Sequence, residues 1–328
     1  MTELGAARSA IVKGTDSDAS QNATVLVMHY DALAAGGGAA SGCTGTLLAP
    51  TLVLTARHCV SITDEGAACD GSGKAITGGK VMGDHDPAKI YVFGGATRPD
   101  FLSGKFDPSR GREILSTGVS TLCNNDIALL VLDKPVSGAT IAPVRLDASI
   151  AAGETVTVVG WGISDQENNP ETRKQRSGVT IESAGPNERL GPAEFRIGEG
   201  TCSGDSGGPA FSAQGAVLGA LSRGGNGTNN IGADACLGGT NIFTSTVGHA
   251  DFIRAGYARV NAQPWLEGQP MPVADAGTSV PPSTASPPPE DDGCNASSRD
   301  GALSPWSALL VASVLMVLFV LRRRRNTA

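Results

Sequence analysis

The stretch TCSGDSGGP at residues 201–209 decides the fold of this 328-residue chain. Within it, Ser206 lies among glycines and directly follows Asp205, so a short rigid loop can hold its hydroxyl group and leave backbone N–H groups free. A neutral serine is a weak nucleophile and needs a general base from elsewhere in the chain. The stretch therefore predicts a nucleophilic serine at position 206.

Two upstream motifs offer the missing groups. TARHC at residues 55–59 contains His58, which can act as the base, and NNDIALL at residues 124–130 contains Asp126 at the start of an apolar run. The chain order His, Asp, Ser is one of several convergent arrangements of the same catalytic triad. The three motifs together indicate acyl transfer by Ser206.

An alternative fold uses the same serine. GDSGG at residues 204–208 also satisfies the G-x-S-x-G elbow of α/β-hydrolases, whose acid and base lie downstream, where Asp234 and His249 could serve. That elbow leads from the serine into a helix. Two glycines and Pro209 directly after Ser206 oppose a helix at this point. The arrangement with an upstream base is therefore favoured.

The three motifs resemble those of the trypsin/chymotrypsin-like serine peptidases, and the resemblance runs from about Ile11 to about Trp265. It implies an all-β fold of two packed antiparallel six-stranded β-barrels with a C-terminal helix and the active site in the cleft between the barrels. We assign residues 11–267 to this protease domain. The base and the acid would belong to the first barrel and the nucleophile to the second.

The resemblance assigns a role to each group. His58 would take the proton of Ser206 during attack and return it to the leaving amine, by way of an acyl-enzyme, while Asp126 orients the imidazole and stabilises its charged form. The backbone N–H groups of Gly204 and Ser206 would form the oxyanion hole. The expected substrates are polypeptides, and we expect no cofactor.

The resemblance also implies an activation step. In that family a freed Ile-Val terminus folds inward, and its α-amino group pairs with the aspartate before the serine. Ile11-Val12 matches that terminus and Asp205 matches the acceptor, which predicts a zymogen that another protease activates by cleavage before Ile11. Residues 1–10 would be the remnant of a propeptide. Lys13 stands where the family usually has glycine, and the alternative is that Ile11-Val12 simply forms the first strand.

The primary specificity pocket is expected to be uncharged. The resemblance places its base six residues before the nucleophile, at Gly200, which predicts a preference for small or apolar side chains over Arg or Lys. A small loop shift would bring the charge of the neighbouring Glu199 into the pocket. The other pocket residues that the resemblance implies are Thr201, Ser222, Gly224 and Asn241.

Residues 221–224 (LSRG) are expected to be the strand that pairs with an extended substrate through main-chain hydrogen bonds. Arg223 replaces the aromatic residue that is usual in the family. We expect the Arg223 side chain to be exposed, where it either favours acidic groups on the substrate or is simply solvated.

Six of the seven cysteines fall within the protease domain, at positions 43, 59, 69, 123, 202 and 236. Six cysteines allow fifteen pairings. The resemblance implies Cys43–Cys59 beside the histidine loop and Cys202–Cys236 beside the pocket, which leaves Cys69–Cys123 as the third bond. Such bonds indicate an oxidising, extracytoplasmic compartment.

Composition agrees with an exported β-rich enzyme. The 44 glycines separate short apolar runs that predict strands at 51–55, 127–132, 155–160 and 216–221, and a late amphipathic run predicts a packing helix at about 250–260. The formal net charge is −7, and −11 without the four arginines at 322–325, which argues against nucleic-acid binding. We expect a monomer.

Two further histidines are weaker candidates for function. His29 falls in an apolar early strand, and His85 lies between Asp84 and Asp86 in an expected loop. The two aspartates with His85 could bind a cation, but solvation of a loop is the favoured explanation. We assign no metal site.

The composition changes after the protease domain. Residues 268–293 are rich in proline and predict a disordered linker, or stalk. Cys294, an apolar run at 306–321 and the arginines at 322–325 follow in an order that resembles the C-terminal sorting tails of myxobacterial surface proteins. For residues 294–328 this implies a single transmembrane segment with cytoplasmic arginines and processing at Cys294 by a sorting peptidase. The alternative is a plain tail anchor with an unpaired thiol.

Export also needs a signal, and residues 1–8 contain no apolar core, so we expect a leader upstream of Met1. The sequence thus predicts a serine endopeptidase that is anchored at the cell surface or shed from it. The alternative from a different class is a catalytically inactive homologue that uses the same fold to bind polypeptides at the surface.

Overall fold

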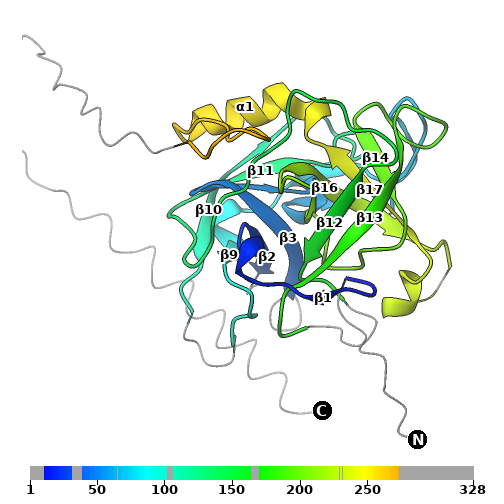
Figure 1. Cartoon of the computed structure of the whole chain (residues 1–328). Coiled ribbons are helices and arrows are strands. Elements are labelled where there is room, and N and C mark those ends of the chain that lie inside the picture. The colour runs from blue at the N-terminus through cyan, green and yellow to red at the C-terminus, as the bar shows by residue number, and fades with distance from the viewer. Residues whose placement is uncertain are drawn as a thin grey trace, which may run out of the picture. The chain divides into compact units, whose positions relative to one another are not determined.

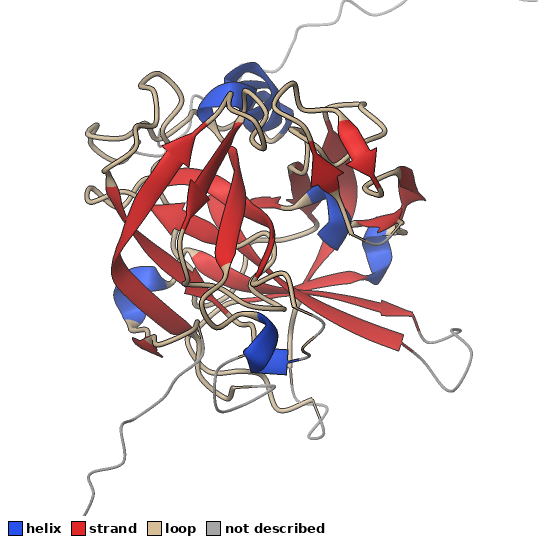
Figure 2. Ribbon diagram, turned by 90° about the vertical axis from the view of Figure 1, so that its right-hand side faces the viewer, coloured by secondary structure: helices blue, strands red, loops and turns tan. Residues whose placement is uncertain are grey.

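Two closed antiparallel β-sheets make up most of the part of the chain that the structure describes. The structure is a computed structural model, and it describes residues 11–31, 39–64, 66–101, 106–163, 170–228, 230 and 232–272. Figure 2 shows that strands dominate this part and that the helical segments are short. The prediction of two six-stranded barrels with a short C-terminal helix is confirmed.

The first barrel has the strand order β10-β11-β4-β3-β2-β9 and closes through the pairing of β9 with β10. The side chains of each strand point alternately to its two faces, and the inward-facing valine, leucine and isoleucine side chains form a separate hydrophobic core. The strands are β2 (Thr24–Asp31), β3 (Ala39–Ala49), β4 (Leu52–Thr55), β9 (Ile90–Phe93), β10 (Ser109–Ser116) and β11 (Ala128–Leu132).

The second barrel has the order β13-β12-β15-β16-β17-β14 and closes through the pairing of β13 with β14. The short strand β1 (Thr15–Asp16) adds to the free edge of β13. Phe195 and Phe243 stack within its core at a centroid distance of 5.2 Å. The strands are β12 (Thr155–Gly160), β13 (Lys174–Ala184), β14 (Glu194–Ile197), β15 (Pro209–Phe211), β16 (Val217–Gly225) and β17 (Thr240–Ser245).

Two small two-stranded sheets and several single turns of 3-10 helix connect these strands. One sheet pairs β5 (Ser61–Thr63) with β8 (Val81–Asp84), and the other is a hairpin of β6 (Ala68–Cys69) and β7 (Ala75–Thr77). The 3-10 helices are Ala19–Gln21, Arg57–Cys59, Pro87–Lys89, Gly232–Ala235 and Val247–His249.

Helix α1 (Ala250–Arg259) covers the junction of the two barrels. Its buried residues Ile253 and Tyr257 share a hydrophobic cluster with residues of β4 and β11 from the first barrel and of β16 from the second. Gly256 allows close approach, because a Cβ there would lie 2.2 Å from a methyl carbon of Leu129. The helix, seen at the top of Figure 1, therefore contacts both barrels at once.

The structure agrees with the expected strands and differs most at β16. Three of the predicted strands match β4, β11 and β12 to within one residue at either end. The fourth, predicted at 216–221, continues to Gly225, because β17 pairs with it through Gly224↔Asn241 and Gly225↔Thr240. The separate expectation that residues 221–224 form a strand agrees with this extension.

A fully buried arginine ties the N-terminal segment to the rest of the domain. The Arg173 guanidinium has no exposed surface, and burial lowers its pKa to about 10. Its N–H groups donate to Ser17 Oγ, to Asn22 Oδ1 and to the carbonyl oxygens of Asp18, Thr24 and Gly95. These bonds fix the course of residues 17–24 between the two barrels.

Several expected features lie outside the described residues. These are residues 1–10, most of the 268–293 linker, Cys294, the apolar run at 306–321 and the arginine cluster. Within the part that the structure describes, no helix is long and apolar enough to cross a membrane.

Candidate active site

His58 and Asp126 come from the same end of the first barrel. His58 lies in the 3-10 helix directly after β4, and Asp126 precedes β11, which pairs with β4. Asp126 Oδ2 accepts a hydrogen bond from His58 Nδ1 at 2.8 Å, and Asp126 Oδ1 accepts one from the backbone N–H of His58 at 3.0 Å. The aspartate is buried, whereas the His58 side chain is 24% exposed. This leaves Nε2 of His58 free of the aspartate.

The electrostatics of this pair keep Asp126 charged. Burial opposes the charged form of His58, but the charge of Asp126 and the hydrogen bond outweigh it and raise the His58 pKa above its ordinary value. Burial also opposes ionisation of Asp126, but the His58 charge and hydrogen bonds from His58 and Ser222 lower its pKa. Ser222 Oγ donates to Asp126 Oδ2 at 2.7 Å. The pair is thus set up for a neutral imidazole that becomes charged when it accepts a proton.

The loop that carries Ser206 is bonded to the first barrel by Thr44 of β3. The Thr44 backbone N–H donates to the Ser206 carbonyl oxygen at 2.8 Å, and Thr44 Oγ1 donates to the Gly204 carbonyl oxygen at 2.9 Å. The Sγ of Cys59, the residue after His58, lies 3.5 Å from the same Ser206 oxygen. The structure therefore brings the Ser206 loop next to His58, although no hydrogen bond joins Ser206 Oγ to the imidazole among the described residues.

Glycine is required at two positions of this loop. Gly204 has a φ of +95°, and a Cβ there would lie 2.8 Å from Gly162 Cα; Gly207 has a φ of +77°, and a Cβ there would lie 2.1 Å from Thr55 Oγ1. The resulting conformation leaves the backbone N–H groups of Gly204 and Ser206 without an acceptor in the described part of the chain. Two free donors beside a serine hydroxyl are the components of an oxyanion hole.

Asp205 is buried and has no cationic partner among the described residues. Its two oxygens accept hydrogen bonds from the backbone N–H groups of Gly162 and Cys202, each at 2.8 Å. Burial raises its pKa to about 7, although these two bonds partly oppose the shift. Ile11 is also fully buried, in the core of the second barrel, and among the described residues it makes no ion pair with Asp205. In the uncleaved chain the Ile11 nitrogen is an amide, so it carries no charge.

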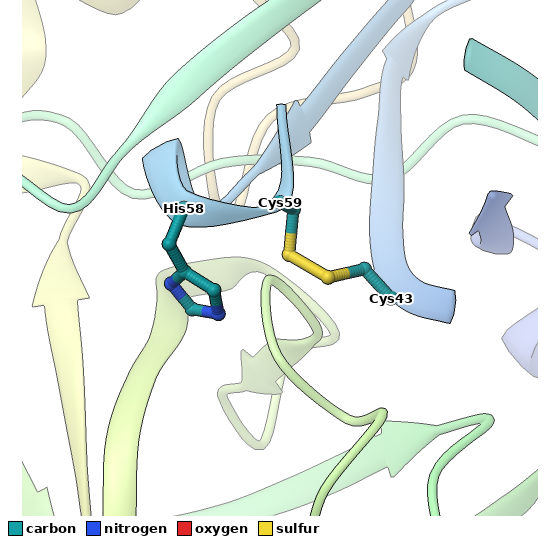
Figure 3. Close-up of side chains that lie close together, drawn as sticks. All are labelled: Cys43, His58 and Cys59. Atoms are coloured by element: carbon teal, nitrogen blue, oxygen red, sulfur yellow. A yellow bond between two sulfur atoms is a disulfide. The ribbon is translucent and has the colours of Figure 1, made fainter. Parts of the chain in front are cut away.

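Three disulfide bonds brace the loops around the site. Cys43–Cys59 joins β3 to the histidine turn, Cys69–Cys123 joins the β6–β7 hairpin to the segment before Asp126, and Cys202–Cys236 joins the serine loop to a 3-10 helix. Figure 3 shows the His58 ring beside the Cys43–Cys59 bond. The ligand atoms of these three residues lie within 4.8 Å of one another, but both sulfurs are bonded to each other and so offer no thiolate to a metal.

The expected pocket residues lie on β16, β17 and the segment after β14. The Ser222 hydroxyl donates to Asp126 Oδ2 at 2.7 Å. Asn241 Nδ2 donates to the Gly198 carbonyl oxygen at 2.9 Å, and a Cβ on Gly224 would lie 2.2 Å from Asn241 Oδ1. Gly200 and Thr201 are also buried, and a Cβ on Gly200 would lie 3.5 Å from Ile197 Cδ1.

Glu199 does not act as a free charge near the pocket. Its Oε1 lies 2.7 Å from Lys13 Nζ and 3.3 Å from an Arg176 nitrogen, and its Oε2 accepts from the Gly238 N–H at 2.7 Å. The Lys13 ion pair joins the segment after Ile11 to the pocket loop. A loop shift that brought Glu199 into the pocket would break these contacts.

The expectation for Arg223 is wrong. Its side chain is only 16% exposed, and both of its terminal nitrogens bond to the Glu194 carboxylate, at 2.7 and 3.0 Å. The side chain is therefore neither solvated nor free to meet an acidic substrate. The reason is a buried acid on β14, which β17 separates from β16 in the sheet, and the local sequence does not reveal it.

A cavity of about 610 Å³ lies beside the end of β16. Arg223, Gly224 and Gly225 line one side of it, and the β6–β7 hairpin with Cys69 lines another. Glu188 and Arg189 also contribute. The cavity thus extends from the strand end that follows Ser222 to the hairpin that the Cys69–Cys123 bond holds.

Comparison with known proteins agrees with this architecture. The family model described as Trypsin matches residues 12–237, and the chain belongs to the trypsin family of serine peptidases. Snake venom serine protease Haly-2 from Gloydius brevicauda is 28% identical over 263 residues, 75% of this chain and 86% of that protein. Trypsin from Saccharopolyspora erythraea is 25% identical over 178 residues, 51% and 69% of the two chains.

A solved structure named "Atomic resolution structure of HBP" has the same fold. It aligns with a TM-score of 0.51 at 21% identity and covers 77% of this chain and 99% of that one.

Sequence reasoning missed two residues that hold the site together. Thr44 follows Cys43 directly, and the expected Cys43–Cys59 bond was a signal that Thr44 lies near His58. Glu194 had only a weak signal, as a lone acid between the apolar residues Ala193 and Phe195.

Proposed function

We propose that this protein is a serine endopeptidase in which Ser206 is the nucleophile, His58 the general base and Asp126 the group that orients His58. The observation that carries the proposal is the hydrogen bond between His58 Nδ1 and the buried Asp126, beside a serine loop that Thr44 bonds to the first barrel. It supplies an imidazole whose Nε2 is free to accept a proton and a neighbouring serine that can lose one.

The steps of the reaction follow from these positions. Ser206 Oγ forms a bond to the carbonyl carbon of the substrate while its proton passes to His58 Nε2. The N–H groups of Gly204 and Ser206 then donate to the oxyanion. When the tetrahedral intermediate collapses, the C–N bond breaks and His58 returns the proton to the leaving amine. Water, deprotonated by the same nitrogen, hydrolyses the acyl-enzyme and restores Ser206.

Activation by cleavage before Ile11 is part of the proposal. Cleavage would convert the Ile11 nitrogen into an ammonium group, and Asp205 is a buried carboxylate that pairs with no cation in the part of the chain that the structure describes. Pairing the two would remove the cost of an unpaired buried charge and fix the loop between Gly204 and Gly207. Lys13 would support the new terminus through its ion pair with Glu199.

The proposed specificity is for small or apolar side chains at the primary site. The support is that Gly200 carries no charge and that the nearest acid, Glu199, is neutralised by Lys13 and Arg176. An extracytoplasmic location is proposed on the three disulfide bonds, which persist in oxidising compartments. Anchoring through residues 306–321 and processing at Cys294 remain predictions from the sequence.

A fluorophosphonate probe tests the catalytic proposal. Protein processed to begin at Ile11 should be labelled, and the Ser206→Ala variant should not. Ser203→Ala, three residues earlier in the same loop, is the matched control and should label like the parent. Absence of labelling in correctly folded, processed protein would favour the inactive polypeptide-binding homologue. Cleavage of a peptide library by the same samples then tests the neutral primary specificity, and a strong Arg or Lys preference contradicts it.

A further inference from the structure

Glu194 is a buried acid whose every contact lies close to the candidate triad. Its side chain has no exposed surface. Oε1 accepts from the Asn124 backbone N–H at 2.9 Å and from Arg223 at 2.7 Å, and Oε2 accepts from the Gly191 N–H at 2.9 Å and from Arg223 at 3.0 Å. Four donors satisfy the carboxylate, so its burial is stable only while they stay in place.

Two of these donor residues are linked to Asp126, one through the backbone and the other through a hydrogen bond of the residue next to it. Asn124 precedes Asp126 by two residues, and Arg223 directly follows Ser222, whose hydroxyl donates to Asp126. Contacts therefore close a ring that runs from Asp126 through Asn124, Glu194, Arg223 and Ser222 back to Asp126. The ring crosses from the first barrel to the second and returns.

Asn124 is held on two sides. Its φ of +63° is a left-handed conformation that asparagine tolerates better than most residues. Its backbone N–H bonds to Glu194, and its Oδ1 accepts from the Ala193 N–H at 2.6 Å. The approach is close enough that a Cβ on Gly191 would lie 2.6 Å from Asn124 Oδ1. The segment leading into Asp126 is thus fixed against the second barrel.

We propose that Glu194 is a positioning residue for the triad: its ion pair with Arg223 fixes Asp126 relative to His58. The proposal rests on the proposed function, since it concerns how that triad is held. Glu194 has no exposed surface and so cannot touch a substrate, and it acts through its hydrogen-bond partners Asn124, Gly191 and Arg223. Because Asp126 sets the charge balance of His58, a looser ring weakens the His58–Asp126 contact.

The charge that balances Glu194 is specific. Arg223 presents two N–H groups in one plane, which matches the two carboxylate oxygens, whereas lysine could supply only one donor direction. His249 also faces this cluster: its Nδ1 lies 3.0 Å from the Ser245 carbonyl oxygen and its ring bonds to the Asn124 backbone. Burial lowers the His249 pKa, so this ring stays neutral and Arg223 provides the positive charge.

The test compares Glu194→Gln and Arg223→Lys with a matched control, Glu182→Gln. The control removes an acid from an ion pair of the same barrel, Arg196–Glu182 at 3.0 Å, in which both side chains are well exposed. The His58 pKa is measured by NMR from its Cε1–H signal in full-length Ser206→Ala protein, which needs no turnover. We expect Glu194→Gln to lower the His58 pKa by about 0.5 units or more, since the raised pKa depends on Asp126, with a smaller shift for Arg223→Lys.

Activity gives the second readout in protein that begins at Ile11. We expect kcat to fall about tenfold or more for Glu194→Gln with KM changed less than about threefold, and Arg223→Lys to be intermediate. If both variants match Glu182→Gln in His58 pKa and in kcat, the pair has no positioning role and the proposal is overturned. If Glu194→Gln does not fold, as judged by near-ultraviolet circular dichroism, Arg223→Lys decides in the same way. An inactive parent would refute the proposed function, while the NMR titration would still decide the role of Glu194.

Discussion

Replacing Asp205 by asparagine in the uncleaved chain tests the consequence of burying a carboxylate whose hydrogen bonds, among the described residues, come only from backbone N–H groups. Burial raises the Asp205 pKa to about 7, against 3.8 for an ordinary aspartate. Below pH 3.8 the carboxyl group is protonated in both the folded and the unfolded chain, so it does not make the free energy of unfolding depend on pH. Between about pH 4 and pH 7 the folded chain keeps a proton that the unfolded chain has released. The free energy of unfolding therefore falls as the pH rises through this range.

The magnitude follows from the width of the range. Each pH unit costs about 1.4 kcal/mol, so three units cost roughly 4 kcal/mol by pH 7, after which the loss is constant. The asparagine side chain has no proton to lose, and its single oxygen can keep one of the two backbone hydrogen bonds. Asp205→Asn should therefore gain stability relative to the parent by roughly this amount between pH 4 and pH 7.

Urea unfolding at a series of pH values measures this difference. Both proteins carry Ser206→Ala to prevent self-cleavage, keep their disulfide bonds intact and are followed by the fluorescence of Trp161 and Trp265. Asp147→Asn, which removes a surface carboxylate, controls for the loss of one negative charge. Parallel profiles for the parent and Asp205→Asn from pH 4 to pH 7 would refute the reasoning.

Cleavage before Ile11 should reverse the sign of the effect that Asp205→Asn has on the free energy of unfolding. A new ammonium group beside Asp205 would lower its pKa below 3.8, and a lowered pKa contributes stability above the unfolded value that is lost only as the pH falls through the folded one. The same Asp205→Asn change should then destabilise processed protein at pH 7.

Three further outcomes are expected. Gly204→Ala should lower kcat by about 100-fold, because the new Cβ would displace an oxyanion donor, whereas Gly215→Ala, with a similar φ of +77° but no atom within 4 Å, should leave kcat unchanged in a peptide assay. Removing Cys69–Cys123 by a double serine substitution should lower the free energy of unfolding by up to about 4 kcal/mol in urea, given the 54-residue separation. The rate kcat/KM should rise with pH to a midpoint above about 6.5, since the His58 pKa is raised, and a profile flat across that range contradicts His58 as base.

The fold and the chemical groups could be predicted from the sequence because short motifs carry them. The loop around Ser206 depends on two glycines with positive φ, which a short sequence pattern carries, although its hydrogen bonds to Thr44 and Gly162 do not follow from that pattern. The strand before His58, β4, and the strand after Asp126, β11, are continuous apolar runs, and their pairing with each other follows once the fold is known. These features are local, and local features survive in sequence patterns.

The contacts of Arg223 and Glu199 could not be predicted, because their partners are distant along the chain. Arg223 and Glu194 are 29 residues apart, and nothing in either strand sequence requires that they meet. Glu199 meets Lys13 only after the N-terminal segment packs beside the second barrel. Side-chain charge alone suggested solvent exposure for Arg223, and only the tertiary structure shows a buried acid within reach.

The candidate site depends on both barrels in a reciprocal way. Thr44 of the first barrel bonds to the loop that carries the nucleophile of the second, and Ser222 of the second barrel bonds to Asp126 of the first. A small displacement of one barrel would therefore disturb the nucleophile and the base together. Helix α1 packs against both barrels elsewhere, through Ile253 and Tyr257. Under the proposed mechanism, the relative position of the barrels affects catalysis, and Glu194 of the second barrel, which accepts a hydrogen bond from Asn124 close to Asp126, offers a test of it.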